Sequence, residues 1–259
     1  MQCHRGVQSS QSKTKIGNRR CELALREAEF LGTIAKTRGY DYPLEQIDAL
    51  WKNVLYTQFH DILPGSSINR VYKETEKLYD DVLNELADIK QGMYTHLLDE
   101  GDCLTVSNSL SFERNVIVTL PEGFDGAVAG KKALPVQKFG DGLIAEVTVP
   151  ACGSVTIHKG EKASLQNGAS ATVTANGAVI ENAHIKAVFN EFGAITSITD
   201  KQTGGELCSG LCNDIRMYKD ISVQFEAWDV DTSYEFCPVE LKEKAAFELV
   251  SPGPVKAAF

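Results

Sequence analysis

The hydrophobic positions of the chain repeat with a helical period over the first hundred residues and with a strand period after them. In the first part, apolar side chains recur three and four positions apart, which places them on one face of an α-helix. The stretches run from Asn18 to about Lys36, from Pro43 to a point before Pro64, and from a cap at Ser66 or Ser67 to Leu97. Three amphipathic helices with short connections can bury one another's apolar faces, so we predict an antiparallel three-helix bundle over residues 18–100.

Short β-rich runs separated by Gly, Pro and Asp follow after Gly101. They are residues 103–106, 115–120, 143–149 and 154–157, with a further candidate strand at 171–174. A second β region begins with a run at 181–189, turns at 190–193 and returns at 194–199. We predict an α+β multidomain chain in which an antiparallel β-sandwich region, incomplete within this sequence, follows the bundle.

The composition is that of a globular protein with an acidic surface. The 259 residues are 43% hydrophobic and 24% charged, with a mean hydropathy of −0.17. The formal net charge of −9 argues against a nucleic-acid or anionic-membrane partner, because phosphate groups bind basic surfaces. Apolar runs fall far short of the roughly 20 residues that cross a bilayer, and residues 1–6 lack the apolar core of a signal peptide. Because residues 255–259 end on an apolar, strand-like run, we expect a piece of a longer protein.

The chemistry-bearing stretch places His60 and Asp61 next to each other where a helix ends and the chain turns through Pro64-Gly65. A neutral imidazole is a common zinc ligand, and a neighbouring carboxylate can bind a hydroxylated substrate. Alternatively, Asp61 hydrogen-bonds His60 or satisfies backbone donors in the turn. The residues alone leave both interpretations open.

Two other groups of polar residues are weaker candidates. Cys208 and Cys212 form the only close pair among the seven cysteines, and two further ligands at zinc-binding spacing do not follow. The scattered cysteines fit a reducing compartment. The acids Glu226, Asp229 and Asp231 indicate either a cation site or, more simply, a solvated face.

Residues 58–68, Gln-Phe-His-Asp-Ile-Leu-Pro-Gly-Ser-Ser-Ile, closely resemble the signature of the α-mannosidases of glycoside hydrolase family 38. Two further stretches resemble the family in order and spacing. Residues 4–22 resemble the end of its catalytic domain, and residues 213–231 resemble a segment of its C-terminal β region. The resemblance implies the tail of a catalytic α/β domain at 1–17 and a middle domain at 18–100. It implies a β-sandwich subdomain at 101–160 and the start of a larger, truncated β-sandwich at 161–259.

The resemblance also implies roles for individual residues. In this family the histidine of the signature is a zinc ligand and the following aspartate contacts the mannose, so His60 is the metal candidate and Asp61 a substrate-binding candidate. His4 matches a position near the sugar and is a second substrate-binding candidate, with an exposed residue near the chain start as the alternative. We expect Trp228 to anchor the core rather than to serve as a sugar platform.

A retaining glycosidase uses two carboxyl groups about 5 Å apart. In the family these carboxylates and the remaining zinc ligands lie upstream of anything in this chain. The resemblance therefore implies no catalytic residue here, one zinc ion shared with the upstream domain, and a chain that is inactive alone. It implies a mannose-containing oligosaccharide as substrate and, together with the cysteines, a cytoplasmic location. Homo-oligomerisation stays open, and the alternative function is a non-catalytic carbohydrate- or subunit-binding module.

Overall fold

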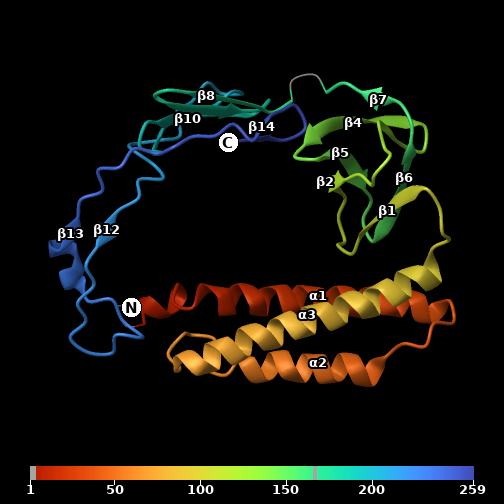
Figure 1. Ribbon diagram of the computed structural model, residues 1–259, viewed down its shortest axis with the longest axis horizontal. Helices are drawn as coiled ribbons and strands as arrows, with labels where there is room; N and C mark the ends of the chain where they lie inside the picture. The colour runs from red at the N-terminus through yellow and green to blue at the C-terminus, as the bar shows by residue number, and fades with distance from the viewer. Residues whose placement is uncertain (1–3, 166–167) are drawn as a thin grey trace. The chain divides into compact units, whose positions relative to one another are not determined.

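The computed structural model describes residues 4–165 and 168–259, in which helices come first and antiparallel sheets follow (Figure 1). The predicted α+β class is confirmed. The chain forms two compact units, one holding the residues up to Glu100 with Tyr218–Pro238 and the other holding Gly101–Met217 with Val239–Phe259. Among the described helices, none is long and apolar enough to cross a membrane.

The first unit is built on a bundle of three helices, which confirms the predicted bundle. They are α1 (Ser12–Thr37), α2 (Leu44–Thr57) and α3 (Asn69–Leu97). All three helices contact one another and share one buried core, whose members include Leu25, Leu31, Val54, Tyr79, Leu86 and Met93. Two short 3₁₀ helices, η1 (Gly6–Gln8) and η2 (Thr232–Phe236), belong to the same unit. Burial of the apolar faces that the sequence pattern marks is the main stabilisation of such helices.

The start of α1 differs from the prediction. The helix begins at Ser12 rather than at Asn18. In its first turns the buried side chains are the polar ones of Thr14 and Asn18. The apolar side chain of Ile16 lies on the exposed side of the same turns. The apolar period therefore does not mark this part of the helix.

The predicted cap of α3 is wrong. Ile68 occupies the N-cap position and its side chain makes no capping bond. Ser66 instead directs its hydroxyl to Asp61 Oδ1 at 3.5 Å, and the backbone N–H of Ser67 donates to the Tyr72 hydroxyl at 2.6 Å. Both serines therefore serve the turn before the helix rather than the helix itself.

The second unit begins with a strongly curved antiparallel sheet. Its strands are β1 (Cys103–Asn108), β2 (Arg114–Thr119), β3 (Ala127–Ala129), β4 (Lys132–Phe139), β5 (Gly142–Val149) and β6 (Gly153–Lys159). They run in the order β1-β6-β3-β4-β5-β2, and β7 (Lys162–Ala163) pairs in parallel with β4. Side chains of both edge strands, including Val106 of β1 and Val118 of β2, pack against the same buried cluster. The two edge strands thus share one core, and this region is a single seven-stranded sheet rather than the two facing sheets of a sandwich.

A four-stranded antiparallel sheet follows in the order β11-β10-β9-β8. Its strands are β8 (Ser170–Thr174), β9 (Gly177–Glu181), β10 (Ile185–Asn190) and β11 (Ile195–Asp200). The predicted turn at 190–193 is confirmed, with Asn190 Oδ1 accepting the N–H groups of Phe192 and Ala194. The run predicted at 181–189 is not one strand: it holds the last residue of β9, a turn, and most of β10. Asn182 Oδ1 accepts the N–H groups of His184 and Ile185 in that turn.

Two short strand pairs complete the described structure. They are β12 (Met217–Tyr218) with β13 (Pro238–Val239), and β14 (Ser251–Pro252) with β15 (Ala257–Ala258). Strands β14 and β15 contact β8, so the end of the chain packs against the four-stranded sheet.

Candidate functional site

His60 and Asp61 lie in a hydrogen-bonded turn directly after α2. The backbone N–H groups of Ile62 and Leu63 both donate to the carbonyl of Phe59, at 2.9 and 3.1 Å, so the backbone around the pair is fixed. The His60 side chain is 78% exposed and the Asp61 side chain 48%. The turn therefore presents an imidazole and a carboxylate together at the surface of this unit.

The two side chains are neighbours without being bonded partners. His60 Nε2 lies 3.6 Å from Asp61 Oδ2, which exceeds the usual hydrogen-bond range. The imidazole packs on the ring of Phe59, with centroids 4.1 Å apart, and Asp61 Oδ1 faces the Ser66 hydroxyl. The interpretation in which Asp61 serves only to hold His60 is therefore disfavoured, and both groups can meet a ligand.

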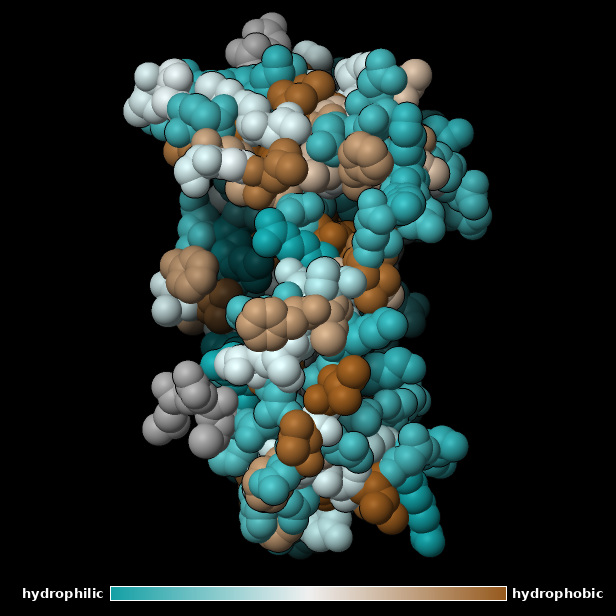
Figure 2. All heavy atoms as spheres, turned by 90° about the vertical axis from the view of Figure 1, so that its left-hand side faces the viewer, coloured by the Kyte–Doolittle hydropathy of each residue, from teal (hydrophilic) through white to brown (hydrophobic). Residues whose placement is uncertain are grey.

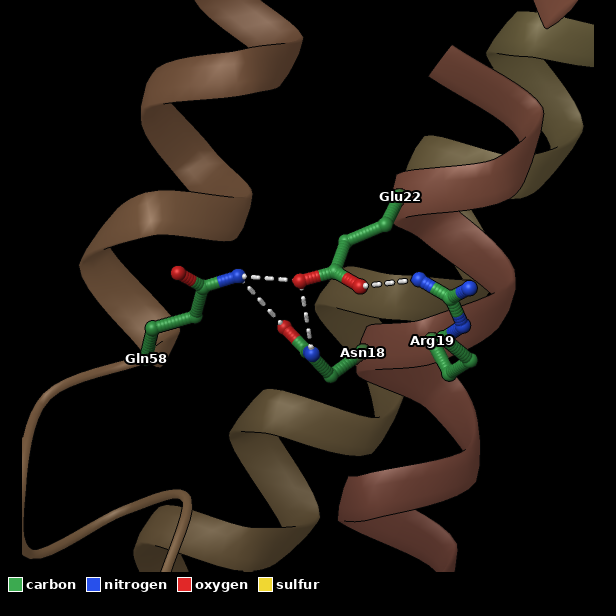
Figure 3. Close-up of polar contacts among 4 residues, drawn as sticks. All are labelled: Asn18, Arg19, Glu22 and Gln58. Atoms are coloured by element: carbon green, nitrogen blue, oxygen red, sulfur yellow. Dashed lines mark hydrogen bonds and ion pairs between the residues drawn. The ribbon is translucent and has the colours of Figure 1, made fainter. Parts of the chain in front are cut away.

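Helix α1 holds the start of this turn through a polar network (Figure 3). The Gln58 side-chain amide donates to Asn18 Oδ1 at 3.0 Å and to Glu22 Oε1 at 2.9 Å. Asn18 Nδ2 also donates to Glu22 Oε1 at 3.2 Å, and Arg19 pairs with the other carboxylate oxygen of Glu22 at 3.1 Å. Gln58 stands two positions before His60, so this network holds the chain close to the point where the imidazole branches from it.

Helix α1 also holds the end of the turn, through Lys15. Its ammonium donates to the carbonyls of Leu63 at 3.0 Å and Pro64 at 3.2 Å, and to that of Ser10 at 2.5 Å. Partial burial lowers the pKa of Lys15 below its usual value of 10.5. Residues 15, 18 and 22 lie on one face of α1 by helical spacing, so one helix face holds both ends of the turn.

Gly65 closes the turn in a conformation that suits glycine. Its φ is +103°, and a Cβ at this position would lie 2.7 Å from Ser10 Cβ. Ser10 is itself held by bonds from its backbone N–H and its hydroxyl to the Gly6 carbonyl, at 3.0 and 2.7 Å. The segment before α1 therefore packs directly against the turn.

A pocket of about 490 Å³ in the same unit is lined in part by Ser66, whose hydroxyl faces Asp61. Ser66 lines it on one side and the loop Ser222–Trp228 lines the other. The edge of the His4 ring meets the Trp228 ring at a centroid distance of 5.3 Å, and the His4 backbone N–H donates to the Asp229 carboxylate. The pocket is thus bordered by Ser66, the partner of Asp61, and by Trp228, the partner of His4.

One expectation about this loop needs correction, and two of its acids have a role that the sequence did not show. Trp228 is 38% exposed and lines the pocket, so the prediction that it anchors the core is wrong. Two of the three acids are used locally, since Asp229 accepts the His4 backbone N–H and Asp231 Oδ2 accepts that of Val223 at 2.7 Å. Both carboxylates therefore help to hold the loop from positions that are partly open to solvent.

Metal donors are sparse in the described structure. Within residues 4–165 and 168–259, no group of three or more His, Cys, Asp or Glu side chains is placed to hold a metal ion. Cys208 and Cys212 are free thiols whose sulfur atoms lie 3.6 Å apart. Desolvation, followed by the hydrogen bond from Cys212, raises the pKa of Cys208 above its usual value of 9.0.

The sequence pattern did not reveal the residues that support the turn. Lys15, Asn18 and Glu22 lie in the stretch that resembles the family, but nothing in their spacing shows that they reach residues 58–64. Phe225, which lines the pocket, also carries no signal in the sequence pattern. Its exposure depends on a local backbone conformation that hydrophobic periodicity does not report.

Two family models match stretches at the beginning and the end of the chain. The family model described as "Alpha mannosidase middle domain" matches residues 2–97, and the "Glycosyl hydrolases family 38 C-terminal domain" model matches residues 180–258. The two matches follow each other along the chain and together take up more than half of it. The chain belongs to glycoside hydrolase family 38.

Curated relatives and solved structures agree with this family. The chain is 26% identical to Alpha-mannosidase G of Dictyostelium discoideum over 98% of its own length and 27% of that protein. It is 26% identical to Alpha-mannosidase 2C1 of Homo sapiens over 89% of its length and 22% of that protein. A 75-residue stretch is 48% identical to Alpha-mannosidase of Saccharomyces cerevisiae, over 27% of this chain and 7% of that one.

The crystal structure of an alpha-mannosidase from Enterococcus faecalis V583 has the same fold. It matches with a TM-score of 0.60 and 19% identity, over 78% of this chain and 29% of the other. The chain spans about a quarter of the length of the first two of these curated relatives.

Proposed function

We propose that this chain supplies one corner of the active site of a zinc-dependent, retaining α-mannosidase that hydrolyses α-mannosidic bonds in glycans. The observation that supports this most is the turn at His60 and Asp61, where an exposed imidazole and an exposed carboxylate stand together on a backbone held from α1. The family membership and the α-mannosidase relatives supply the reaction class.

The donors present fit a part of a zinc site. Zinc takes about four ligands, commonly imidazole nitrogens and carboxylate oxygens. His60 is of the right kind and reachable from solvent, but the described residues provide no group of three donors. We therefore propose that His60 supplies one ligand and that the other ligands, the nucleophile and the acid/base come from a domain outside this sequence, as the family resemblance implies.

Each side chain then has a distinct task. His60 would hold the ion through a ring nitrogen, while the ring of Phe59 at 4.1 Å limits its rotation. Asp61 would accept hydrogen bonds from mannose hydroxyls, because an ionised carboxylate is an acceptor with several lone pairs. When bound, zinc would orient the sugar hydroxyls and stabilise charge that develops on a sugar oxygen. Ser66, facing Asp61 Oδ1 at 3.5 Å, would help to keep that carboxylate in place.

Hydrolysis of an aryl α-mannoside with added zinc tests the proposal. The assay compares the 259-residue chain with a protein extended by the sequence encoded upstream. We expect turnover from the extended protein alone, because a retaining mechanism needs two carboxyl groups about 5 Å apart. Turnover by the 259-residue chain would contradict the proposed division of the active site.

The ligand assignment has its own test in the extended protein. We expect His60→Ala to remove bound zinc and activity together, and His184→Ala, a change at another exposed histidine, to remove neither. Full zinc occupancy in His60→Ala would contradict the assignment. The non-catalytic alternative makes a different prediction for the upstream-extended protein: saturable binding of mannose oligomers in calorimetric titration, with and without chelator, but no hydrolysis of the aryl α-mannoside when zinc is added.

A further inference from the structure

The loop Ser222–Trp228 presents two aromatic rings side by side to solvent. The rings of Phe225 and Trp228 are stacked at a centroid distance of 5.9 Å with planes 15° apart, and the residues are 63% and 38% exposed. Phe225 has a φ of +56°, a conformation that bulky residues rarely adopt. Local strain of this kind concentrates at binding sites, where the surrounding structure holds it in place.

Several hydrogen bonds hold the loop in this shape. The backbone N–H groups of Trp228 and Asp229 donate to the Phe225 carbonyl at 2.8 and 2.9 Å, which closes a tight turn. The N–H of Gly6 donates to the Trp228 carbonyl at 2.9 Å, and a Cβ at Gly6 would lie 3.2 Å from that oxygen. The stacked pair is therefore presented by a backbone fixed on both sides.

The pocket beside the two rings is lined by both apolar and polar side chains. The pocket of about 490 Å³ lies within the roughly 300–1,000 Å³ range of small-ligand sites. Its polar groups are hydroxyls, an amide and a carboxylate, contributed by Ser66, Ser222, Gln224 and Glu226. A pyranose ring has the matching surface, because its C–H groups form an apolar face and its hydroxyls form a polar rim.

We propose that Phe225 and Trp228 form a carbohydrate subsite that receives a second sugar of the glycan, next to the one that Asp61 would bind. The link between the two positions is Ser66, which lines the pocket and faces Asp61 Oδ1 at 3.5 Å. The identity of the sugar rests on the proposed function. The stacking surface itself rests on the geometry of the loop.

A polypeptide is the other occupant that an exposed apolar surface could take. The centres of protein interfaces are apolar and depleted of charged residues. Here Gln224 and Glu226 alternate along the loop with the exposed apolar residues Val223 and Phe225, so polar groups interrupt the apolar surface. Figure 2, which faces the side where β12 and β13 lie in Figure 1, shows apolar groups in separate patches among hydrophilic ones. This mixture favours a sugar.

Tryptophan fluorescence can report on the subsite directly, because the chain has two tryptophans. In a Trp51→Phe background, Trp228 is the single emitter, and the 259-residue chain is titrated with an α-linked mannotriose in the presence of a chelator. We expect a saturable change in emission. Phe225→Ala and Phe225→Leu should weaken binding by roughly threefold to tenfold, the equivalent of one aromatic contact. The matched control is Phe236→Ala, since Phe236 is an aromatic 86% exposed outside the pocket lining.

Far-ultraviolet circular dichroism of each variant confirms that the fold is kept, and Phe225→Leu retains apolar volume if Phe225→Ala does not fold. No saturable signal, or an equal loss of affinity in Phe236→Ala, would overturn the subsite. The subsite would also be overturned if Trp228 of the upstream-extended protein did not respond to mannotriose. That result would mean that polypeptide covers the Trp228 ring. His60→Ala should change the affinity for mannotriose by less than about twofold, which is smaller than the loss expected when one contact is removed. Failure of the zinc-dependent assay with this signal intact would therefore refute only the proposed catalytic function.

Discussion

The Gln58 side-chain amide, at the end of α2, donates to Glu22 Oε1 of α1 at 2.9 Å. Asn18 also donates to Glu22 Oε1, and Arg19 pairs with the other carboxylate oxygen, Glu22 Oε2, at 3.1 Å (Figure 3). A hydrogen bond to a charged acceptor is stronger than one between neutral groups. The contact therefore links the packing of two helices to the position of His60, two residues further along the chain.

A double-mutant cycle with Gln58→Ala and Glu22→Ala tests this link. We expect a coupling of about 1 kcal/mol in the free energy of unfolding, measured by urea denaturation, because the two side chains share one network. In the upstream-extended protein, Gln58→Ala should also lower zinc affinity by about tenfold, the lower end of the loss seen when the support of a ligand is removed.

The control is Gln46→Ala. Gln46 donates to Glu85 at 2.6 Å and so joins α2 to α3 with the same pair of residue types. We expect this variant to leave zinc affinity unchanged. Additive effects of the Gln58 and Glu22 substitutions, or an equal loss of zinc affinity in the control, would argue against the positioning role.

Gly65→Ala should destabilise the bundle more than Gly39→Ala. Both glycines have positive φ, +103° and +90°, so both substitutions carry the cost of a left-handed residue, about 1–2 kcal/mol. At Gly65 the new Cβ would also lie 2.7 Å from Ser10 Cβ, whereas at Gly39 no atom lies within 4 Å. Urea denaturation of both variants separates the cost of the backbone conformation from the cost of the contact with Ser10. Equal loss in the free energy of unfolding would show that Ser10 moves aside at little cost.

The parts of the fold that could be predicted are those with a local signal. The apolar period marks all three helices, and runs of β-branched residues mark β1, β2, β5 and β6. Strand β4 was missed because Lys132, Pro135, Gln137 and Lys138 interrupt its alternation. Gln137 is nevertheless buried, since the chain end returns to pair with it.

In the candidate site, too, the residues with a local sequence signal could be predicted and the others could not. His60 and Asp61 are adjacent in the sequence, so the fold is bound to bring them together. Lys15 and Glu22 reach their turn only through the register in which α1 packs against α2, and no local pattern encodes that register. Trp228 was misassigned because an aromatic residue is usually buried, whereas here the turn of its own loop exposes it.

Gln137 fastens the end of the chain to β4, and Gln137→Leu should release it. The Gln137 amide donates to Ser251 Oγ at 2.5 Å and to the Lys256 carbonyl at 2.9 Å. Its carbonyl accepts the backbone N–H groups of Val255 and Lys256, at 2.6 and 2.9 Å. Leucine would leave the buried N–H of Val255 and the part-buried N–H of Lys256 without their acceptor, at a cost of about 2–3 kcal/mol, while the Lys256 carbonyl keeps the Ser251 hydroxyl as a donor.

The measurement is limited proteolysis of residues 240–250, which have no regular secondary structure, combined with urea denaturation. Cleavage should be faster in Gln137→Leu than in Gln91→Leu, which alters an exposed glutamine on α3. Equal cleavage rates would show that the contacts of β14 and β15 with β8 suffice to hold the chain end.

Glu206 should make the second unit sensitive to acid. Its carboxylate accepts the Ser197 hydroxyl at 2.6 Å and the N–H groups of Cys208 at 2.8 Å and Ile198 at 2.9 Å. These bonds, that of Ser197 foremost, lower the pKa of Glu206 from 4.5 to about 2. Because the pKa is lower in the folded state, the stabilisation is present above pH 4.5 and is lost as the pH falls towards 2.

Glu206→Gln therefore should lower the urea midpoint at neutral pH and should flatten its decline between pH 4.5 and 2. Glu122→Gln, a change at an exposed carboxylate between β2 and β3, should keep the decline of the unsubstituted chain. The two curves of the chain and Glu206→Gln should approach each other as the pH falls to about 2, where the carboxyl is protonated in the unfolded state and about half protonated in the folded state. A constant separation across this range would mean that glutamine disturbs packing rather than removing the charge that the three donors stabilise.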